Sequence, residues 1–183
     1  MSRIPARPVV GVLHPGVMGA ALGSALKPVA GAVVWAAAGR SVPTSKRAEL
    51  ADLVGVPDVP ALARRAHVIV SVCPPHAALD VATQVARALD GRAGRPVYVD
   101  ANAVPPATVT AIAELLGPEH VVDASVIGPP AWERGSTVLW LAGAAAAEVA
   151  ALFDRSPFDA RVLGPELGAA SALKAAPGCT ARS

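Results

Sequence analysis

A glycine-rich turn near the start of the chain constrains the fold more than any other stretch. An apolar run at residues 8–13 ends in the turn 14–16, after which small and apolar residues recur at helical spacing through residue 26. This pattern predicts a strand, a tight turn and a helix. In such a unit Gly16 would let the backbone approach a pyrophosphate, and Gly19 would let the helix pack on the strand. The positive end of the helix would face the same anion.

We interpret this turn as a dinucleotide-binding turn of the Rossmann type, although it departs from the full pattern. His14 stands where G-x-G-x-x-G has its first glycine, and histidine tolerates a left-handed turn better than most residues. The alternative is a packing turn that holds no nucleotide, because a match of two glycines is a weak signal.

Short apolar runs that alternate with helical patterns predict the rest of the fold. Three runs rich in β-branched residues are nearly continuous, as in strands buried on both faces of a parallel sheet. These runs are residues 33–35, 68–72 and 97–100. Helical patterns are found at 45–54, 59–65, 77–89, 109–116 and 144–153, and further strand patterns at 121–122 and 137–141. The alternation predicts an α/β fold, namely a Rossmann-like, doubly wound, mostly parallel sheet with helices on both faces.

Composition and charge narrow the class of protein. Hydrophobic residues make up 53% of the 183 residues but aromatic residues only 3%, so we expect one domain with a core of alanine, valine and leucine. A net charge of +2 without a basic stripe argues against nucleic acid as a partner. No apolar stretch is long enough to cross a membrane. The histidines and the two cysteines, Cys73 and Cys179, lack metal-ligand spacing, so no metal is expected, and a cytoplasmic location fits best.

The residues after the second predicted strand favour NADP over NAD. A site for NAD usually has Asp or Glu there to hold the ribose 2′-hydroxyl, but the first acidic residue of this chain is Glu49. Arg40, Ser41, Lys46 and Arg47 instead supply cations and a hydroxyl where a 2′-phosphate would sit. The alternative is that Arg40 is an ordinary solvated loop arginine.

Six stretches in order resemble the β-hydroxyacid dehydrogenases, the superfamily of 6-phosphogluconate and 3-hydroxyisobutyrate dehydrogenases. Residues 11–19 resemble the G-x-I-G-x-G-x-M-G opening, and 39–41 resemble the N-R-T loop that binds the 2′-phosphate in NADP-using members. The later matches are 72–75 with the loop along the cofactor, 100–105 with D-x-S/T/N-x-x-P, 123–129 with D-A-P-V-S-G-G and 164–174 with G-x-x-G-x-G-x-x-x-K.

The resemblance implies an oxidoreductase that transfers hydride between NADP and a small hydroxy acid or related substrate. It makes Lys174 the counterpart of the catalytic lysine and implies a small-molecule substrate and a homodimer as partners. The implied cofactor contacts are His14, Pro15, Gly16, Val17, Met18, Arg40, Ser41, Cys73, Pro74 and Asn102, and the implied substrate contacts are Asn102, Gly128 and Pro129. Ile127 and Pro129 depart from the family's serine and second glycine in the substrate loop.

The C-terminal stretch leaves the activity open. We expect residues 1–168 to form the NADP-binding Rossmann domain and residues 169–183 to form the start of a truncated interdomain helix and a tail. Family members continue this helix into a helical domain, whereas Pro177 would end it here, and Gly178 replaces the family's asparagine. The alternatives are a non-catalytic NADP-binding module or a truncated remnant, with Lys174 a solvated lysine near a frayed end.

Overall fold

The computed structural model describes residues 3–131 and 133–175. Its strands are β1 (Val9–Val12), β2 (Ala32–Ala36), β3 (Val54–Val56), β4 (Val68–Ser71), β5 (Val97–Asp100), β6 (Val121–Ile127), β7 (Val138–Ala142) and β8 (Asp159–Gly164). Its helices are α1 (Val17–Leu26), α2 (Val42–Leu50), α3 (Val59–Arg65), α4 (Ala78–Ala88), α5 (Pro106–Leu116), α6 (Ala146–Ala151) and α7 (Ala169–Ala175), with 3₁₀ turns η1 (Pro75–Ala77) and η2 (Pro118–His120). The predictions that concern Pro177, Gly178 and Cys179 lie outside the described residues.

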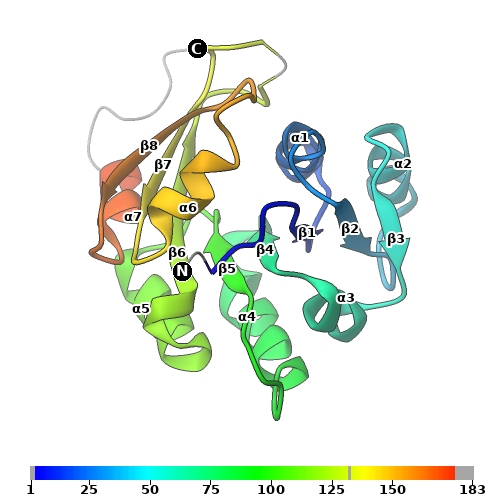
Figure 1. Cartoon of the computed structure of the whole chain (residues 1–183), viewed down its shortest axis with the longest axis horizontal. Coiled ribbons are helices and arrows are strands. Elements are labelled where there is room, and N and C mark those ends of the chain that lie inside the picture. Colours follow the sequence, from blue (N-terminus) through cyan, green and yellow to red (C-terminus); the bar gives the residue numbers. More distant parts are fainter. Residues whose placement is uncertain (1–2, 132, 176–183) are drawn as a thin grey trace.

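The strands form one sheet in the order β3-β2-β1-β4-β5-β6-β7-β8 (Figure 1). All neighbouring strands are parallel except β6 and β7, which pair antiparallel. The chain runs outward from β1 to β3, returns to place β4 beside β1, and then runs outward on the other side. The order of strands therefore reverses between β1 and β4, and the predicted doubly wound, mostly parallel sheet is confirmed.

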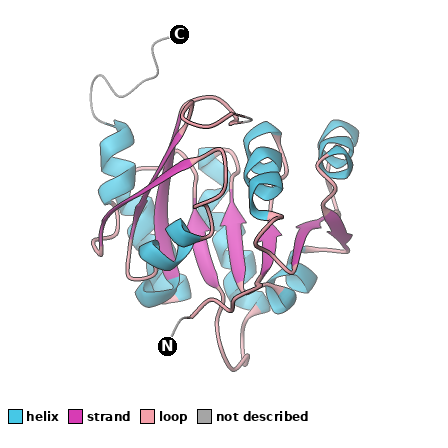
Figure 2. Ribbon diagram, turned by 45° about the horizontal axis from the view of Figure 1, so that its top comes forward, coloured by secondary structure: helices cyan, strands magenta, loops and turns pink. Residues whose placement is uncertain are grey.

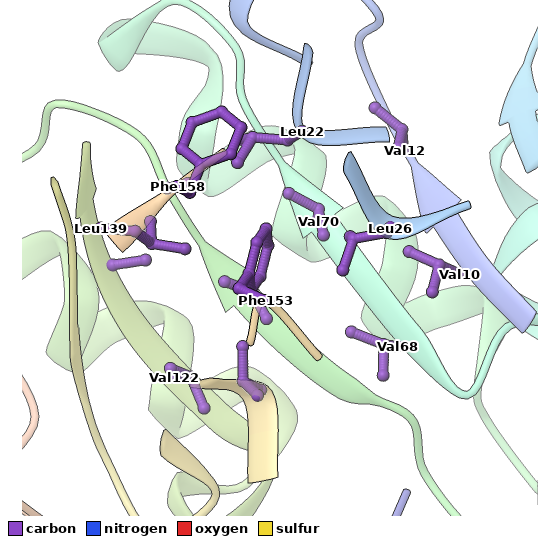
Figure 3. Close-up of a cluster of buried hydrophobic side chains, with 14 of the residues drawn as sticks. Val10, Val12, Leu22, Leu26, Val68, Val70, Val122, Leu139, Phe153 and Phe158 are labelled. Carbon is purple, nitrogen blue, oxygen red and sulfur yellow. The ribbon is translucent and has the colours of Figure 1, made fainter. Parts of the chain in front are cut away.

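Helices cover both faces of this sheet (Figure 2). Helices α1 and α6 pack on one face, and α3, α4 and α5 pack on the other, so each face has its own buried apolar cluster. Valine, leucine and alanine dominate both clusters, as the composition predicts. Figure 3 shows the first cluster, in which the rings of Phe153 and Phe158 lie edge to face with centroids 5.9 Å apart.

Several element bounds differ from the sequence prediction. The helix expected at 45–54 begins at Val42, because Ser41 caps its first turn, and it ends at Leu50. Asp52 follows with a left-handed backbone (φ 55°), and Val54 then starts β3. Strand β8 was not predicted, because most of its side chains are exposed or half-buried and show no apolar alternation.

The described residues contain neither a membrane-spanning helix nor a metal-binding cluster. None of the helices described is both long and apolar enough to span a bilayer. Across the same ranges, no group of three or more His, Cys, Asp or Glu side chains is placed to hold a metal ion.

Candidate functional site

The predicted cofactor residues lie at one end of the sheet, in the loops that follow the carboxyl ends of β1, β2, β4 and β5 (Figure 1). The loop after β1 is tied directly to β4, because the backbone N–H of Leu13 donates to the carbonyl of Val70 at 3.0 Å. The strand order reverses between β1 and β4, and the crevice at the carboxyl ends of such strands is the usual place of ligands in open α/β sheets.

The two glycines of the first turn have different roles. Gly16 is the N-cap of α1, and a Cβ added there would meet no atom within 4 Å. Gly19 lies one turn into the helix, and a Cβ there would overlap the carbonyl oxygen of His14. Gly19 therefore permits close packing, whereas Gly16 leaves open space at the positive end of a helix of 10 residues.

The charge of Arg40, after β2, acts on His14, after β1. Burial, and after it the charge of Arg40, lower the pKa of His14 to about 4, so its imidazole is neutral at pH 7. The buried Nδ1 atom of His14 has no hydrogen-bond partner among the described residues. Arg40 donates from Nε to the carbonyl of Ala36 at 3.2 Å. No bond to the rest of the described chain is found for its terminal amino groups, so they are available for an anion.

Ser41 has a local structural role beside its predicted contact. Its hydroxyl oxygen accepts from the backbone N–H of Thr44 at 3.4 Å and lies 3.0 Å from the Thr44 hydroxyl, so it caps α2. Lys46 and Arg47 are exposed on the same helix. With Arg40, they place three cations within residues 40–47.

Asn102 joins the loop after β4 to the loop after β5. Its side-chain oxygen accepts from the backbone N–H of Cys73 at 2.6 Å. Its side-chain nitrogen donates to the hydroxyl of Ser71 at 3.1 Å and to the carboxylate of Asp100. Both ends of the amide are thus engaged by the protein, and Asn102 is only 2% exposed. The side chain predicted to touch cofactor and substrate mainly fixes the position of the Cys73-Pro74 loop.

A buried polar row crosses the sheet beneath this contact. Ser71, Asp100 and Asp123 are register partners on β4, β5 and β6, so their side chains lie on the same face. Burial, opposed by the hydrogen bonds from Asn102, raises the pKa of Asp100 to about 6. On the same face, burial raises the pKa of Tyr98 far above its usual value.

Helix α7 is fastened to the end of this row. The carboxylate of Asp123 accepts from the Ser171 hydroxyl at 2.6 Å and from its backbone N–H at 2.9 Å. The hydroxyl of Ser125 donates to the carbonyl of Ala170 at 2.6 Å. All three polar side chains are buried, so β6 holds the first turn of α7 through contacts shielded from water.

A cavity of about 310 Å³ opens between α7 and the loop after β5. Lys174 lines it together with Asn102, Ser125 and Ser171, and residues 103–106 supply an apolar wall. Lys174 is half-buried, and this burial lowers its pKa. The structure thus brings the predicted catalytic lysine to Asn102, a residue 72 positions earlier in the printed sequence.

Gly128 and Pro129 do not line this cavity. Gly128 has a left-handed backbone (φ 131°), and a Cβ there would come within 2.5 Å of the Ser136 carbonyl oxygen. The Thr137 hydroxyl donates to the carbonyl of Pro129. These contacts make the residues a tight part of the loop between β6 and β7, which accounts for the glycine without a substrate.

Sequence reasoning missed the polar row and its contacts to α7. The carboxylate of Asp100 also accepts from the Asn102 backbone N–H at 3.2 Å. Asp123 and Ser171 lie within the matched stretches 123–129 and 164–174, but the sequence alone assigns neither of them a role. The available signal was an acidic residue at equivalent positions of two neighbouring buried strands, where a charge needs a partner.

Comparisons with known proteins agree on the architecture. No protein family model matches the sequence, and no curated protein sequence is recognisably similar. A solved protein described as structurally similar to 3-hydroxyacid dehydrogenases is 28% identical, with a TM-score of 0.77 over 90% of this chain and 61% of its own. The chain therefore spans about three fifths of the length of that protein.

Two enzymes share the fold at lower identity. The 3-hydroxyisobutyrate dehydrogenase of Mycobacterium tuberculosis, solved with L-serine, is 17% identical with a TM-score of 0.75, over 92% of this chain and 58% of its own. The imine reductase of Myxococcus stipitatus, solved with NADP⁺, is 21% identical with a TM-score of 0.72, over 92% of this chain and 59% of its own. A variant of that reductase was solved with NAD⁺. The predicted resemblance is thus confirmed in structure: this chain has the Rossmann fold of hydroxyacid dehydrogenase-like and imine reductase proteins.

Proposed function

We propose that this chain binds a nicotinamide dinucleotide at the carboxyl ends of β1 and β4 and that it prefers NADP(H) to NAD(H). The bound cofactor would exchange a hydride with a small hydroxy acid or related substrate. The observation that carries the proposal is the open space at Gly16, at the N-terminus of α1, with the terminal amino groups of Arg40 near the same turn and without a hydrogen bond among the described residues. Structural neighbours solved with NADP⁺ and NAD⁺ support the cofactor class.

The residues present fit such a cofactor. Gly16 has room for a pyrophosphate, and the free N–H groups of α1 point at the same place. Arg40 is the residue that would meet a 2′-phosphate, with Ser41, Lys46 and Arg47 adding charge or a hydroxyl around it. A neutral His14 adds no net charge of its own.

When bound, the dinucleotide would supply or accept a hydride at its nicotinamide ring. In this chain Asn102 fixes the loop after β4 along which the ring would lie. Lys174 would hold or release a proton at Nζ, facing the oxygen of the substrate, and its lowered pKa brings this exchange closer to neutral pH. The cavity of about 310 Å³ suits a small molecule, and its apolar wall offers contacts for a carbon skeleton.

Calorimetric titration with NADP(H) and NAD(H) tests the proposal. We expect tighter binding of NADP(H), with Arg40→Ala losing roughly 10-fold to 100-fold of NADP(H) affinity and little NAD(H) affinity, since one charge-assisted contact is worth ~1.5–3 kcal/mol. Gly16→Val should abolish binding of both, because a side chain would fill the space of the pyrophosphate.

The matched control is Gly55→Val on β3, where an added Cβ has its nearest neighbour at an ordinary 3.6 Å. It should bind both cofactors normally. Equal affinity of the wild type for both cofactors would refute the preference, and normal binding by Gly16→Val would refute the site.

A further inference from the structure

The described part of helix α7, Ala169–Ala175, has little apolar contact with the rest of the fold. Only Ala170 and Ser171 of these residues are buried, and two small side chains bury little apolar surface. Polar contacts with the neighbouring strand therefore contribute a large part of what holds this stretch in place.

Asp123 makes the larger part of these contacts. Its two carboxylate oxygens accept separately from the hydroxyl and the backbone N–H of Ser171, at 2.6 and 2.9 Å. Asp123 is fully buried on β6, which is paired on both sides by β5 and β7. Ser125 adds one hydroxyl contact to the carbonyl of Ala170.

Lys174 follows Ser171 by three positions, so the two side chains lie on one face of the helix. Both line the cavity that Asn102 borders. No ion pair joins Lys174 to Asp123 or to any other acidic group in the ranges described, and burial alone accounts for its lowered pKa. Its location therefore depends on the helix rather than on a direct contact.

We propose that Asp123 is the positioning residue for Lys174: its carboxylate holds the first turn of α7 on β6 and so keeps the lysine in the cavity wall beside Asn102. The proposal rests on the proposed function only in taking Lys174 as the proton-transferring group. The positioning itself requires no cofactor.

The test measures the pKa of the Lys174 amine directly. The chain has three lysines, Lys27, Lys46 and Lys174, so reductive methylation with isotope-labelled formaldehyde gives three lysine NMR signals beside that of the N-terminal amine, and single Lys→Arg variants assign them. Each signal is then followed against pH. Lys46 is exposed and serves as the internal reference.

In the wild type the pKa of Lys174 should lie below the usual value for lysine. In Asp123→Ala it should rise toward that usual value, because the freed helix exposes the amine to water. Loss of the nearby negative charge would by itself shift the pKa of Lys174 the other way, so the sign of the change separates release from a charge effect. Asp123→Asn, which can still bond both Ser171 groups, should restore most of the lowered pKa.

Ser171→Ala keeps the carboxylate but removes one contact, and it should give a smaller rise in the same direction. Ser156→Ala is the matched control, since it removes another buried serine hydroxyl, which accepts from Phe158 at 3.1 Å, outside α7 and β6. It should leave the pKa of Lys174 unchanged.

An unchanged pKa of Lys174 in folded Asp123→Ala and Ser171→Ala would overturn the proposal. If Asp123→Ala does not fold, Ser171→Ala decides, with circular dichroism as the check on folding. Failure of the wild type to bind any dinucleotide would refute the proposed function and leave this measurement valid.

Discussion

The two halves of the candidate site are built in different ways. The cradle half, formed by β1–β3 with α1 and α2, is shaped by backbone: an open glycine at the helix start, a second glycine packed on a carbonyl, and a serine cap. The polar half, formed by β4–β6 with α7, is shaped by buried side chains that bond across the sheet. Contacts in the cradle half are mostly local in sequence, whereas Asp123 and Ser171 are 48 positions apart.

Because of this difference, the two halves suit different parts of a bound cofactor and substrate. A backbone cradle suits a ligand part that is common to many cofactors, because pyrophosphate needs only N–H groups and space. A network of fixed side chains suits the reacting end, where small displacements of a catalytic group cost rate. Damage to the cradle half should therefore affect binding, and damage to the polar half should affect placement and protonation.

The largest expected effect is that of Gly19→Val in the cradle half. A Cβ there overlaps the His14 carbonyl oxygen, so the turn must open, and we expect a loss of about 3 kcal/mol in the free energy of unfolding, at the upper end for overpacked sites. Dinucleotide binding should be lost as well. Urea unfolding measures the first and calorimetry the second, with Gly55→Val as control. A Gly19→Val protein as stable as the wild type would show that close approach of the helix to the His14 carbonyl does not require glycine.

A second comparison sets the two halves against each other through pH. His14 protonates near its usual pKa of 6.5 when unfolded but near pKa 4 when folded, so its contribution to stability is lost as the pH falls from 6.5 to 4. Asp100 has the opposite sign. Its pKa rises from 3.8 to about 6 on folding, so its contribution is lost as the pH rises from 3.8 to 6.

In the wild type, His14 and Asp100 change the free energy of unfolding in opposite directions as the pH changes. Replacing either residue alone should reveal the contribution of each. Relative to wild type, Asp100→Asn should gain about 2–3 kcal/mol as the pH rises from 4 to 6. His14→Gln should gain only about 1 kcal/mol as the pH falls over the same range, because solvent screens its half-buried ring. Urea unfolding at several pH values measures both. If both variants gained stability relative to the wild type in the same direction of pH change, the opposite pKa shifts of His14 and Asp100 would be contradicted.

The smallest expected effect concerns Ser41, whose hydroxyl caps α2. Ser41→Ala should lower the free energy of unfolding by about 1 kcal/mol, as for other lost caps. Asp58 caps α3 in the same way, accepting from Ala61 at 2.8 Å, so Asp58→Ala is a matched control. If Ser41 also contacts the 2′-phosphate, only Ser41→Ala should weaken NADP(H) binding. If both variants bound NADP(H) with equal affinity, Ser41 would cap α2 without contacting the 2′-phosphate.

The cradle half could largely be predicted from the sequence, because its signals are local. The run of apolar residues, the glycines at 16 and 19 and the cations from Arg40 onward all act within a few positions of one another. The bounds failed where a short or exposed strand carries no pattern, as at β3 and β8. The polar half was reached only in part, since the pairing of Asp123 with Ser171 depends on strand register and helix docking, which no single sequence window contains.

Tyr98 gives the polar half a built-in optical reporter. It is the single tyrosine of the chain and is 1% exposed, on the same sheet face as Asp100. Because burial raises the pKa of its hydroxyl, the phenolate absorbance should stay silent on alkaline titration until that face of the sheet opens to water. The onset of this absorbance then marks the alkaline opening of one defined layer of the sheet without any added label, whereas Trp35 and Trp140 lie on the distant strands β2 and β7.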